Sequence, residues 1–542
     1  MFLPILLQVV IYISLSIFRE SVQGDKLSEA EAAELIKSVM PPNSDGTELS
    51  FGAFSTLMSS KQNDAFDFVK QELDMSLMDR PLSQYFIASS HNTYLEGNQL
   101  TSNSSLNRYI NDLLKGCRCV ELDCWDGDDG EPIIYHGHTL TSKIKFNDVI
   151  GTIRQYGFST SSYPIILSIE NHCSHRQQQR MAEIMKGILK NWIAMPGDGI
   201  VNGVLPSPEY LKEKVLLKGK RLPPNESAAA TADEDDEDDE EDEDEDESGK
   251  KPAKKNEKPP KIAQELSDIT YLGTGHVKEF GVAQSAAIPC DKMCSYSEAK
   301  TNKQCKKADI LAGWIHHNKE HLSRVYPAGH RVDSSNYDPT EAWAAGAQMV
   351  ALNYQTFTHP MGYSMHVNDG KFRENGKSGY ILKPDYMLAD SSKPSDPITV
   401  TVHVVSAQQI PKPGGAKSGE VIDPYVVLTL GGVKTDRTEC QTKVIDNNGF
   451  NPCWNEVFSF PITNPDCAHI TFRCMDKDLD NDDFIAQSSI PVSALKPGWR
   501  MIQLFDPNSA CLGDFEHAKL FVRISIAPGL KATKASKAKS KV

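Results

Sequence analysis

The chain has few cysteines, little charge imbalance outside one segment, and a single long hydrophobic run. Its 12 cysteines in 542 residues are too sparse for a disulfide framework, and none has the CxxC spacing typical of zinc sites. Of the 73 acidic residues, 15 form one run at 233–247, and the other 58 nearly balance the 57 lysines and arginines. We therefore expect no nucleic-acid partner. The composition also excludes a collagen, a coiled-coil rod, a multi-span membrane protein and a fully disordered chain.

The hydrophobic run lies at residues 2–18, and we assign residues 1–24 to a hydrophobic signal or anchor segment. As a helix the run would be roughly 26 Å long, which is marginal for crossing a bilayer. Three interpretations stay open. They are a signal peptide with small residues before a cut near Gly24, an anchor whose following basic residues place the body in the cytoplasm, and a gene-model artefact.

Residues 25–80 have helical periodicity, in LSEAEAAELIKSVM and in AFDFVKQELDMSLM. Between these stretches lies NSDGTELSFGAF, which is similar to a calcium-binding EF-hand loop. Glu48 is an extra residue in that loop, and Gly52 stands where the bidentate glutamate is expected. We therefore predict an EF-hand-like helical lobe that does not bind metal.

The remaining segments differ in pattern. Residues 81–222 and 263–388 alternate short apolar runs with helical stretches, and residues 223–262 between them carry blocks of like charge that do not fold. This indicates two α/β halves separated by a disordered acidic and basic linker. Residues 396–528 contain β-rich runs at regular spacing, which favours an antiparallel sandwich, and residues 529–542 form a basic tail.

Ionisable residues end the apolar runs of the first α/β half. CVELDCW carries Glu121 and Asp123 on one strand face, about 6–7 Å apart along the chain. Polar residues at the carboxyl ends of successive strands form the active site of a (β/α)8 barrel. We therefore predict a TIM barrel that is split between the two halves. Its candidate site residues are His91, Asn92, Glu121, Asp123, His136, Glu170, Lys218 and Lys220.

The chemistry of these residues indicates a cation and a phosphorylated substrate. Asn92, Glu121, Asp123 and Glu170 supply hard oxygen atoms, and three carboxylates without a cation would repel one another. Ca²⁺ accepts six to eight oxygens, whereas Mg²⁺ demands stricter octahedral geometry and is less favoured. Histidines beside such an ion suit proton transfer at a phosphoryl group, and lysines suit further phosphates.

Several longer strings resemble eukaryotic phosphoinositide-specific phospholipase C. PLSQYFIASSHNTYLEGNQL, VELDCWDG, IIYHGHTLTSKI, YPIILSIENH and LLKGK look like its X half. ELSDI, LSRVYPAGHRVDSSNYDP, QMVALNYQT and SGYILKP resemble its Y half, the β-rich region its C2 domain, and the amino-terminal lobe its EF-hand region. There is no room for a pleckstrin-homology domain before these segments, so the architecture resembles the short delta-, zeta- or plant-like forms.

The resemblance implies a role for each matching residue. His91 and His136 match the catalytic histidines, and Asn92, Glu121, Asp123 and Glu170 match the calcium ligands. Glu170 also matches the general base, with Asp123 and Glu121 as alternatives. The residues that match the inositol- and phosphate-binding groups are Lys218, Lys220, Ser295, Arg324 and Tyr326. The residues that match C2 calcium ligands are Asp423, Asn447, Asp476, Asp478 and Asp483, and Asp480 or Asp482 could replace the last.

The function implied is calcium-dependent hydrolysis of phosphatidylinositol 4,5-bisphosphate, through a cyclic phosphate, to diacylglycerol and inositol 1,4,5-trisphosphate in second-messenger signalling. The implied partners are phosphoinositides and an anionic membrane surface, and we expect a monomer. We expect a protein at the cytoplasmic side of membranes, peripheral or anchored, or a secretory protein if residues 1–24 are cleaved. Two alternatives are a catalytically silent lipid-binding scaffold and a glycerophosphodiester phosphodiesterase.

Overall fold

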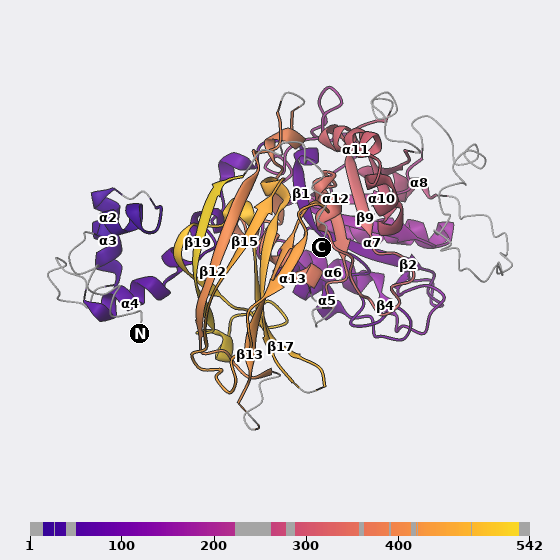
Figure 1. Cartoon of the computed structure of the whole chain (residues 1–542). Coiled ribbons are helices and arrows are strands. Elements are labelled where there is room, and N and C mark those ends of the chain that lie inside the picture. Colours follow the sequence, from indigo (N-terminus) through magenta and orange to yellow (C-terminus); the bar gives the residue numbers. More distant parts are fainter. Residues whose placement is uncertain are drawn as a thin grey trace, which may run out of the picture. The chain divides into compact units, whose positions relative to one another are not determined.

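The computed structural model describes residues 15–25, 28–39, 50–222, 262–277, 288–356, 363–389, 392–413, 419, 421–478 and 480–529. Most of the predicted signal or anchor segment, the EF-hand-like loop, the acidic linker and the basic tail lie outside these residues. The chain forms two compact units (Figure 1). One comprises Glu72–Pro394, and the other comprises Met1–Gln71 together with Ser395–Val542.

The first unit is built around a closed barrel of eight parallel strands. In hydrogen-bonded order they are β1 (Tyr85–Ser90), β2 (Cys119–Trp125), β5 (Ile165–Asn171), β6 (Val215–Gly219), β7 (Leu272–Gly275), β8 (Lys292–Ser297), β9 (Leu322–Tyr326) and β10 (Met349–Leu352). The barrel closes because β10 pairs with β1. Four strands come from each predicted half, so the prediction of a split TIM barrel is confirmed.

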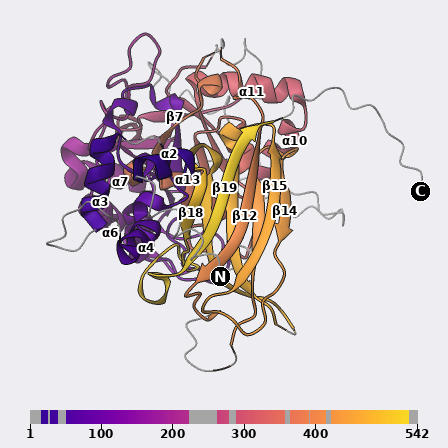
Figure 2. The same ribbon diagram turned by 60° about the vertical axis from the view of Figure 1, so that its left-hand side comes forward.

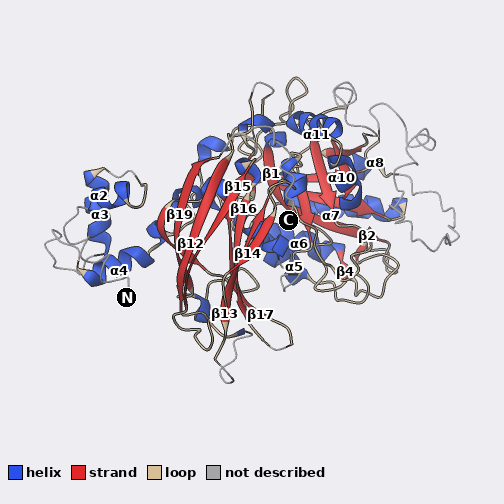
Figure 3. Ribbon diagram, in the orientation of Figure 1, coloured by secondary structure: helices blue, strands red, loops and turns tan. Residues whose placement is uncertain are grey.

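Short strands and helices surround this barrel (Figure 3). β3 (Ile133–Ile134) and β4 (Ile144–Lys145) extend antiparallel from β2, and β11 (Tyr380–Leu382) pairs antiparallel with β1. The helices are α5 (Leu106–Leu114), α6 (Phe146–Tyr156), α7 (His175–Leu189), α8 (Gln264–Ser267), α10 (Glu298–Cys305), α11 (Ala308–Glu320), α12 (Thr340–Ala344) and α13 (Tyr363–Phe372). Every residue of β1 and β10 is buried, as expected for parallel strands that are covered on both faces.

A buried arginine joins the start of β2 to the helices beside it. Arg118 is 0% exposed, and its guanidinium donates hydrogen bonds of 2.7–3.1 Å to four backbone carbonyls. The carbonyls belong to Leu113, Cys117, Gly157 and Ser161. Burial lowers the pKa of Arg118 to about 10, so the side chain keeps its charge at neutral pH.

The second unit contains a sandwich of two antiparallel four-stranded sheets. One sheet has the order β15 (Cys453–Ile462), β12 (Ile398–Gln408), β19 (Lys519–Pro528), β18 (Gly498–Gln503), and Figure 2 shows these strands side by side. The other has the order β14 (Thr438–Gln441), β13 (Pro424–Gly431), β16 (His469–Asp476), β17 (Asp483–Pro491). Alternate residues of β12 are buried, which is the pattern of a sheet with one face on the core. The predicted sandwich is confirmed.

The amino-terminal lobe contains α2 (Leu15–Ser21), α3 (Glu29–Val39) and α4 (Phe51–Ser59). Helix α3 agrees with the helical pattern of LSEAEAAELIKSVM. The helical periodicity of AFDFVKQELDMSLM does not produce an α-helix, because only short 3-10 turns form there, at Phe68–Gln71 and Met75–Leu77. The reason is that Phe66 is buried in the sandwich core and bridges to Leu495, which requires extended backbone.

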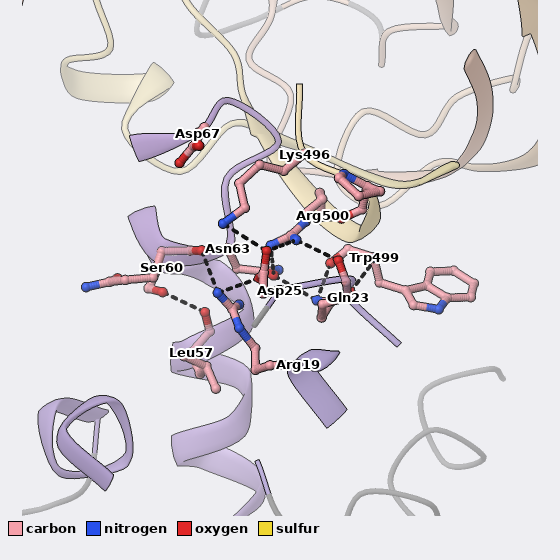
Figure 4. A network of polar contacts seen from close by, with 12 residues as sticks. Arg19, Gln23, Asp25, Leu57, Ser60, Asn63, Asp67, Lys496, Trp499 and Arg500 are labelled. Atoms are coloured by element: carbon pink, nitrogen blue, oxygen red, sulfur yellow. Dashed lines mark hydrogen bonds and ion pairs between the residues drawn. The ribbon is translucent and has the colours of Figure 1, made fainter. Parts of the chain in front are cut away.

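Polar groups of helix α2 and of the turn after it contact strand β18 and the residues just before that strand (Figure 4). We call this set of contacts the N-terminal clasp. The clasp consists of Arg19, Gln23 and Asp25 together with Asn63, Lys496, Trp499 and Arg500. Gln23 is fully buried, and its side-chain amide donates to the Trp499 carbonyl at 2.6 Å and accepts from the Trp499 N–H at 2.5 Å. Gln23 is thus held as a strand partner would be.

A carboxylate forms the charged centre of the clasp. Asp25 is paired with Arg19 at 2.6 Å, with Arg500 at 2.8 Å and with Lys496 at 3.0 Å. The side chains of Arg19 and Arg500 are 3% and 0% exposed. Burial alone would raise the pKa of Asp25, but the three cations outweigh burial and hold that pKa below its ordinary value of 3.8.

Shape complementarity also joins the clasp to the sheet. Gly498 has φ +102°, and a Cβ atom added there would lie 2.6 Å from Cα of Gln23. Glycine is therefore required where the two segments cross.

Among the described helices, none is long and apolar enough to span a membrane.

Candidate active site and calcium sites

The predicted site residues of the barrel lie on or just after the carboxyl ends of its strands. His91 and Asn92 follow β1, Glu121 and Asp123 lie on β2, and Glu170 lies on β5. The parallel register places Asp123 beside Glu170. The remaining predicted residues are Lys218 and Lys220 at the end of β6, Ser295 on β8, and Arg324 and Tyr326 on β9. Six different strands therefore contribute to one end of the barrel.

His91 is held by the strand that neighbours its own. Its backbone N–H donates to the carbonyl of Leu352 at 2.8 Å, and its Nδ1 lies 3.1 Å from Oδ1 of Asn353. Burial lowers the pKa of His91, and the nearby Glu121 carboxylate opposes this shift only in part. The ring is thus oriented through one nitrogen, and the Nε2 edge is left for other contacts.

Asn92 and Glu121 are joined directly. The Asn92 backbone, at φ +43°, donates to Glu121 Oε2 at 2.8 Å, and the Asn92 amide nitrogen donates to Gln99 Oε1 at 2.7 Å. Because the amide nitrogen is held by Gln99, the Asn92 Oδ1 is the amide atom that could serve as a metal ligand. Gln99 therefore sets which end of the amide is presented.

Glu121 is also ion-paired with a residue that was predicted to hold substrate. Arg324 Nη2 lies 2.8 Å from Glu121 Oε2, and the side chains are 4% and 6% exposed. Burial alone would raise the pKa of Glu121, but Arg324 and His91 outweigh it and the pKa is lowered. The expectation that all three carboxylates depend on a cation for charge balance was therefore wrong for Glu121, because Arg324 balances it.

Asp123, Glu170 and His172 form the one group of acidic, histidine or cysteine side chains in the described ranges whose ligand atoms all lie within 4.8 Å. Asp123 is 5% exposed, whereas Glu170 is 55% exposed. Burial and, next, the charge of Glu170 raise the pKa of Asp123 to about 8. Two carboxylates that repel in this way are stabilised by a bound cation.

The donor set at this position fits a hard divalent metal. Of the four predicted ligands, Asp123 and Glu170 belong to this group, whereas Glu121, whose Oε2 accepts from the Asn92 N–H, does not. Cysteines 119 and 124 lie on the same strand but are fully buried with raised thiol pKa values, so they do not offer thiolates. The two carboxylates suit a hard cation such as Ca²⁺, and the His172 ring supplies the one nitrogen of the group.

His136 lies in the loop between β3 and β4 and is half-buried. Its N–H donates to Thr141 Oγ1 at 3.2 Å, and its carbonyl accepts from Thr139 Oγ1 at 2.6 Å. The next residue, Gly137, donates its N–H to Asp123 Oδ2 at 3.2 Å. The loop that carries His136 is thus bonded to the acidic pair.

The predicted phosphate-binding residues form a cationic side of the barrel mouth. Arg324 is the register neighbour of Ser295, and its guanidinium lies 5.8 Å from the centre of the Tyr326 ring. Lys218 is half-buried, and burial together with Arg324 lowers its pKa. Lys220 lies just beyond β6 and is exposed. The Ser295 hydroxyl is buried and makes no hydrogen bond with the described residues.

The predicted C2 residues come together in the loops at one end of the sandwich. Asn447 donates its N–H to Asp423 Oδ1 at 2.6 Å, and Asp423 donates its N–H to Asp476 Oδ1 at 2.7 Å. Asp483 is the cross-strand neighbour of Asp476. Burial raises the pKa of Asp476, and the carboxylates of Asp478, Asp423 and Asp483 add to that shift.

The alternative ligand Asp482 is committed to other contacts. It accepts a hydrogen bond of 2.6 Å from Tyr425 and is paired with Lys477 at 2.9 Å. Asp483 has the position opposite Asp476 instead. Within the described sandwich loops, no three carboxylate oxygens lie within 4.8 Å of one another, so these loops are more open than the acidic group of the barrel.

Comparison with known proteins identifies the same domains. Residues 78–221 match the X domain of phosphatidylinositol-specific phospholipase C, residues 266–386 match its Y domain, and residues 398–506 match a C2 domain. The chain is 41% identical over 537 residues to human 1-phosphatidylinositol 4,5-bisphosphate phosphodiesterase delta-4, which covers 94% of the chain and 69% of that relative.

Two further relatives agree. The Danio rerio delta-3-A phosphodiesterase is 42% identical over 493 residues, and the match spans 87% of the chain but 61% of the relative. The crystal structure of S. officinalis PLC21 superposes with a TM-score of 0.79 at 31% identity, over 96% of the chain and 66% of that structure. The chain thus spans about three fifths to two thirds of the length of these relatives.

A split parallel barrel with an acidic, histidine-containing mouth, accompanied by a C2 sandwich, defines a class of lipid-directed phosphodiesterases. The chain belongs to the phosphatidylinositol-specific phospholipase C family, as the match to human delta-4 shows. The family expected from the sequence motifs is confirmed.

Several site residues were missed by the sequence analysis. Asn353 follows β10 in the same way that His91 follows β1, so the rule applied to the first half would have found it in the second. His172 lies two residues after Glu170 and shares its strand face. Gln99 carries no such signal, because its role depends on how the loop after β1 folds.

Proposed function

We propose that this chain is a calcium-dependent phosphoinositide phospholipase C that converts phosphatidylinositol 4,5-bisphosphate to diacylglycerol and inositol 1,4,5-trisphosphate through a cyclic phosphate. The observation that carries the proposal is one barrel mouth that holds the two predicted catalytic histidines, a pair of facing carboxylates and a cationic side. The relatives are named as 1-phosphatidylinositol 4,5-bisphosphate phosphodiesterases, which supports this substrate.

Residues Asn92, Glu121, Asp123 and Glu170 would hold the calcium ion. When bound, the ion supplies positive charge that lowers the pKa of the inositol 2-hydroxyl and offsets charge on the phosphoryl group. Glu170 is the favoured base for that hydroxyl, since it is 55% exposed, whereas Glu121 is engaged by Arg324. Asp123 stays an alternative.

The two histidines have separate roles in this proposal. His91, oriented by Asn353, contacts the pentacoordinate phosphoryl group with Nε2. Because the Nδ1–H faces the Asn353 Oδ1, this nitrogen donates a hydrogen bond only when the ring is protonated, so the role requires the imidazolium form. His136 protonates the departing diacylglycerol oxygen and then accepts a proton from the water that opens the cyclic phosphate. Both roles are those of groups positioned at a phosphodiester.

The cationic side of the mouth binds the inositol headgroup. Lys218 and Lys220 pair with ring phosphates as point charges, Arg324 can engage phosphate oxygens with two N–H groups, and Tyr326 packs against the ring. Ser295 offers a buried hydroxyl to the same headgroup. Such phosphorylated headgroups belong to the cytoplasmic leaflet, so we place the protein at the cytoplasmic side of membranes.

Exposed apolar side chains near the mouth support contact with lipid. Leu100 is 47% exposed and Leu140 is 84% exposed, and the Leu140 N–H donates to the Leu100 carbonyl at 2.9 Å. Leu140 lies four residues from His136. In the sandwich, Phe450 is 72% exposed and follows Asn447 by three residues. Calcium bound at the sandwich loops would be completed by anionic lipid.

The test is calcium-dependent hydrolysis on vesicles that contain phosphatidylinositol 4,5-bisphosphate. His136→Ala is expected to lower turnover about 10²-fold or more, because a general acid is lost. His175→Ala is the matched control, because His175 is the exposed first residue of α7. Turnover in His136→Ala equal to that of the control would remove His136 from the mechanism.

A catalytically silent scaffold is the second candidate, and the same vesicles distinguish it. A scaffold would bind the vesicles in the presence of calcium without releasing inositol phosphate, whereas the enzyme would do both.

The acidic linker carries a further prediction that lies outside the described residues, namely that its negative charge inhibits the enzyme in solution. Deletion of residues 223–262 is then expected to raise basal activity.

A further inference from the structure

We propose that Trp125 and His172 are positioning residues that hold the acidic pair and the His136 loop in one arrangement. The inference deepens the proposed function and rests on it. Neither residue is among the ligands or catalytic groups assigned above. Their role follows from the way strands β2 and β5 end.

The pair is produced by strand register. Asp123 on β2 is the neighbour of Glu170 on β5. Two residues further along each strand lie Trp125 and His172, whose rings stack at 4.1 Å between centres with an angle of 12° between planes. A backbone hydrogen bond also joins the two segments, since the His172 N–H donates to the Cys124 carbonyl at 2.9 Å.

Each ring of the stack engages the acidic pair. Trp125 Nε1 donates to Asp123 Oδ1 at 2.6 Å. His172 Nε2 lies 2.9 Å from Glu170 Oε1 and 3.6 Å from Asp123 Oδ1. The carboxylates would otherwise turn apart because like charges repel. The stack therefore fixes the direction in which each carboxylate faces.

Trp125 also determines the position of the loop that carries His136. The Tyr135 and His138 rings lie 5.7 Å and 5.0 Å from the Trp125 ring centre. Between them, a Cβ atom added to Gly137 would lie 2.0 Å from the Trp125 ring. Glycine is thus required for the loop to lie flat on the indole. His136 is set relative to Asp123 through this contact.

The arrangement couples two tasks in one aromatic pair. A residue that orients metal ligands without touching the metal commonly contributes 10- to 100-fold to metal affinity or activity. Trp125 in addition supports the loop of the proposed general acid. Loss of the indole N–H is therefore expected to weaken calcium affinity. Loss of the whole ring is expected to slow the protonation of the leaving group as well.

The experiment compares Trp125→Phe, which keeps a ring but loses the N–H, with Trp125→Leu, which loses both. Calcium binding is measured by calorimetry, and the barrel site is assigned as the step that disappears in Asp123→Asn. Trp125→Phe is expected to weaken that step about 10-fold or more. Trp125→Leu is expected to lower kcat further with little change in KM, because the headgroup contacts remain.

The control is Trp192→Phe, since the Trp192 ring packs against Arg154 at 3.7 Å and Phe158 at 4.5 Å, neither of which is a predicted site residue. A Trp125→Phe enzyme with the calcium affinity and kcat of this control, even with a lower Tm, would overturn the proposal. The calorimetric readout does not depend on turnover. An inactive wild type would thus refute the proposed function, whereas unchanged calcium binding in Trp125→Phe would refute the positioning role.

Discussion

Neutralising Asp25 tests whether the N-terminal clasp stabilises the unit that contains the sandwich. In Asp25→Asn the three cations lose their common carboxylate, and Arg19 and Arg500 stay almost fully buried. Removal of one partner from a buried ion pair costs about 3–5 kcal/mol. For a unit of roughly 150–250 residues, each kcal/mol lowers Tm by about 2–4 °C. The expected fall in Tm is therefore about 6–20 °C.

The assay is differential scanning calorimetry of the full chain, with Glu439→Gln as the matched control. Glu439 is 56% exposed and pairs with Arg473 at 2.7 Å in the same unit. Exposed pairs of this kind contribute about 0–1 kcal/mol. A fall in Tm for Asp25→Asn no larger than that of the control would refute the reasoning, because it would mean that the clasp does not need its charge.

The pH dependence gives a second check on the same carboxylate. The pKa of Asp25 is lowered in the folded state, so its stabilising contribution is fully present above the ordinary pKa of 3.8. That contribution is lost as pH falls through the lowered folded-state pKa. The Tm difference between wild type and Asp25→Asn is thus expected to be constant between pH 5 and 8 and to shrink below about pH 4.

Two further predictions concern the barrel and the sandwich. Arg118→Met is expected to destabilise the barrel unit by about 3–5 kcal/mol, since it leaves four carbonyls without their buried donor. Urea denaturation measures this loss of unfolding free energy. A loss below about 1 kcal/mol would contradict the prediction. Asp476→Asn is expected to raise the calcium concentration for half-maximal binding to anionic vesicles about 10-fold, because a buried carboxylate of the sandwich loops is neutralised. Co-sedimentation with the vesicles measures this concentration. A value equal to that of the wild type would count against a calcium site in these loops.

The barrel and the sandwich could be predicted because their signals are local. Strands of the first barrel half are short apolar runs that carry or precede ionisable residues, and β12 alternates in burial along its length. The segment after Ala65 shows the limit of such signals. Its helical periodicity was real, but Phe66 is buried in the sandwich core, and this tertiary contact decided the backbone.

The contacts between the two barrel halves could not be predicted. Glu121 pairs with Arg324, and His91 is oriented by Asn353, across strands that come from opposite sides of the linker. Nothing in the local pattern around either residue states its partner. The residue types at the site were thus available from the sequence, whereas the division of charge among them was not.

The clasp includes the end of the hydrophobic run in the unit that contains the sandwich. The hydrophobic run ends at Phe18 and the predicted signal or anchor segment ends at Gly24, yet Phe18 is 2% exposed and packs edge-on against Phe54 at 5.8 Å. A protease that cut at Gly24 would leave Arg500 without the Gln23 carbonyl and Trp499 without its side-chain partner. The last turn of the hydrophobic run therefore packs as part of the sandwich unit. Shortened versions of the protein should start before Phe18.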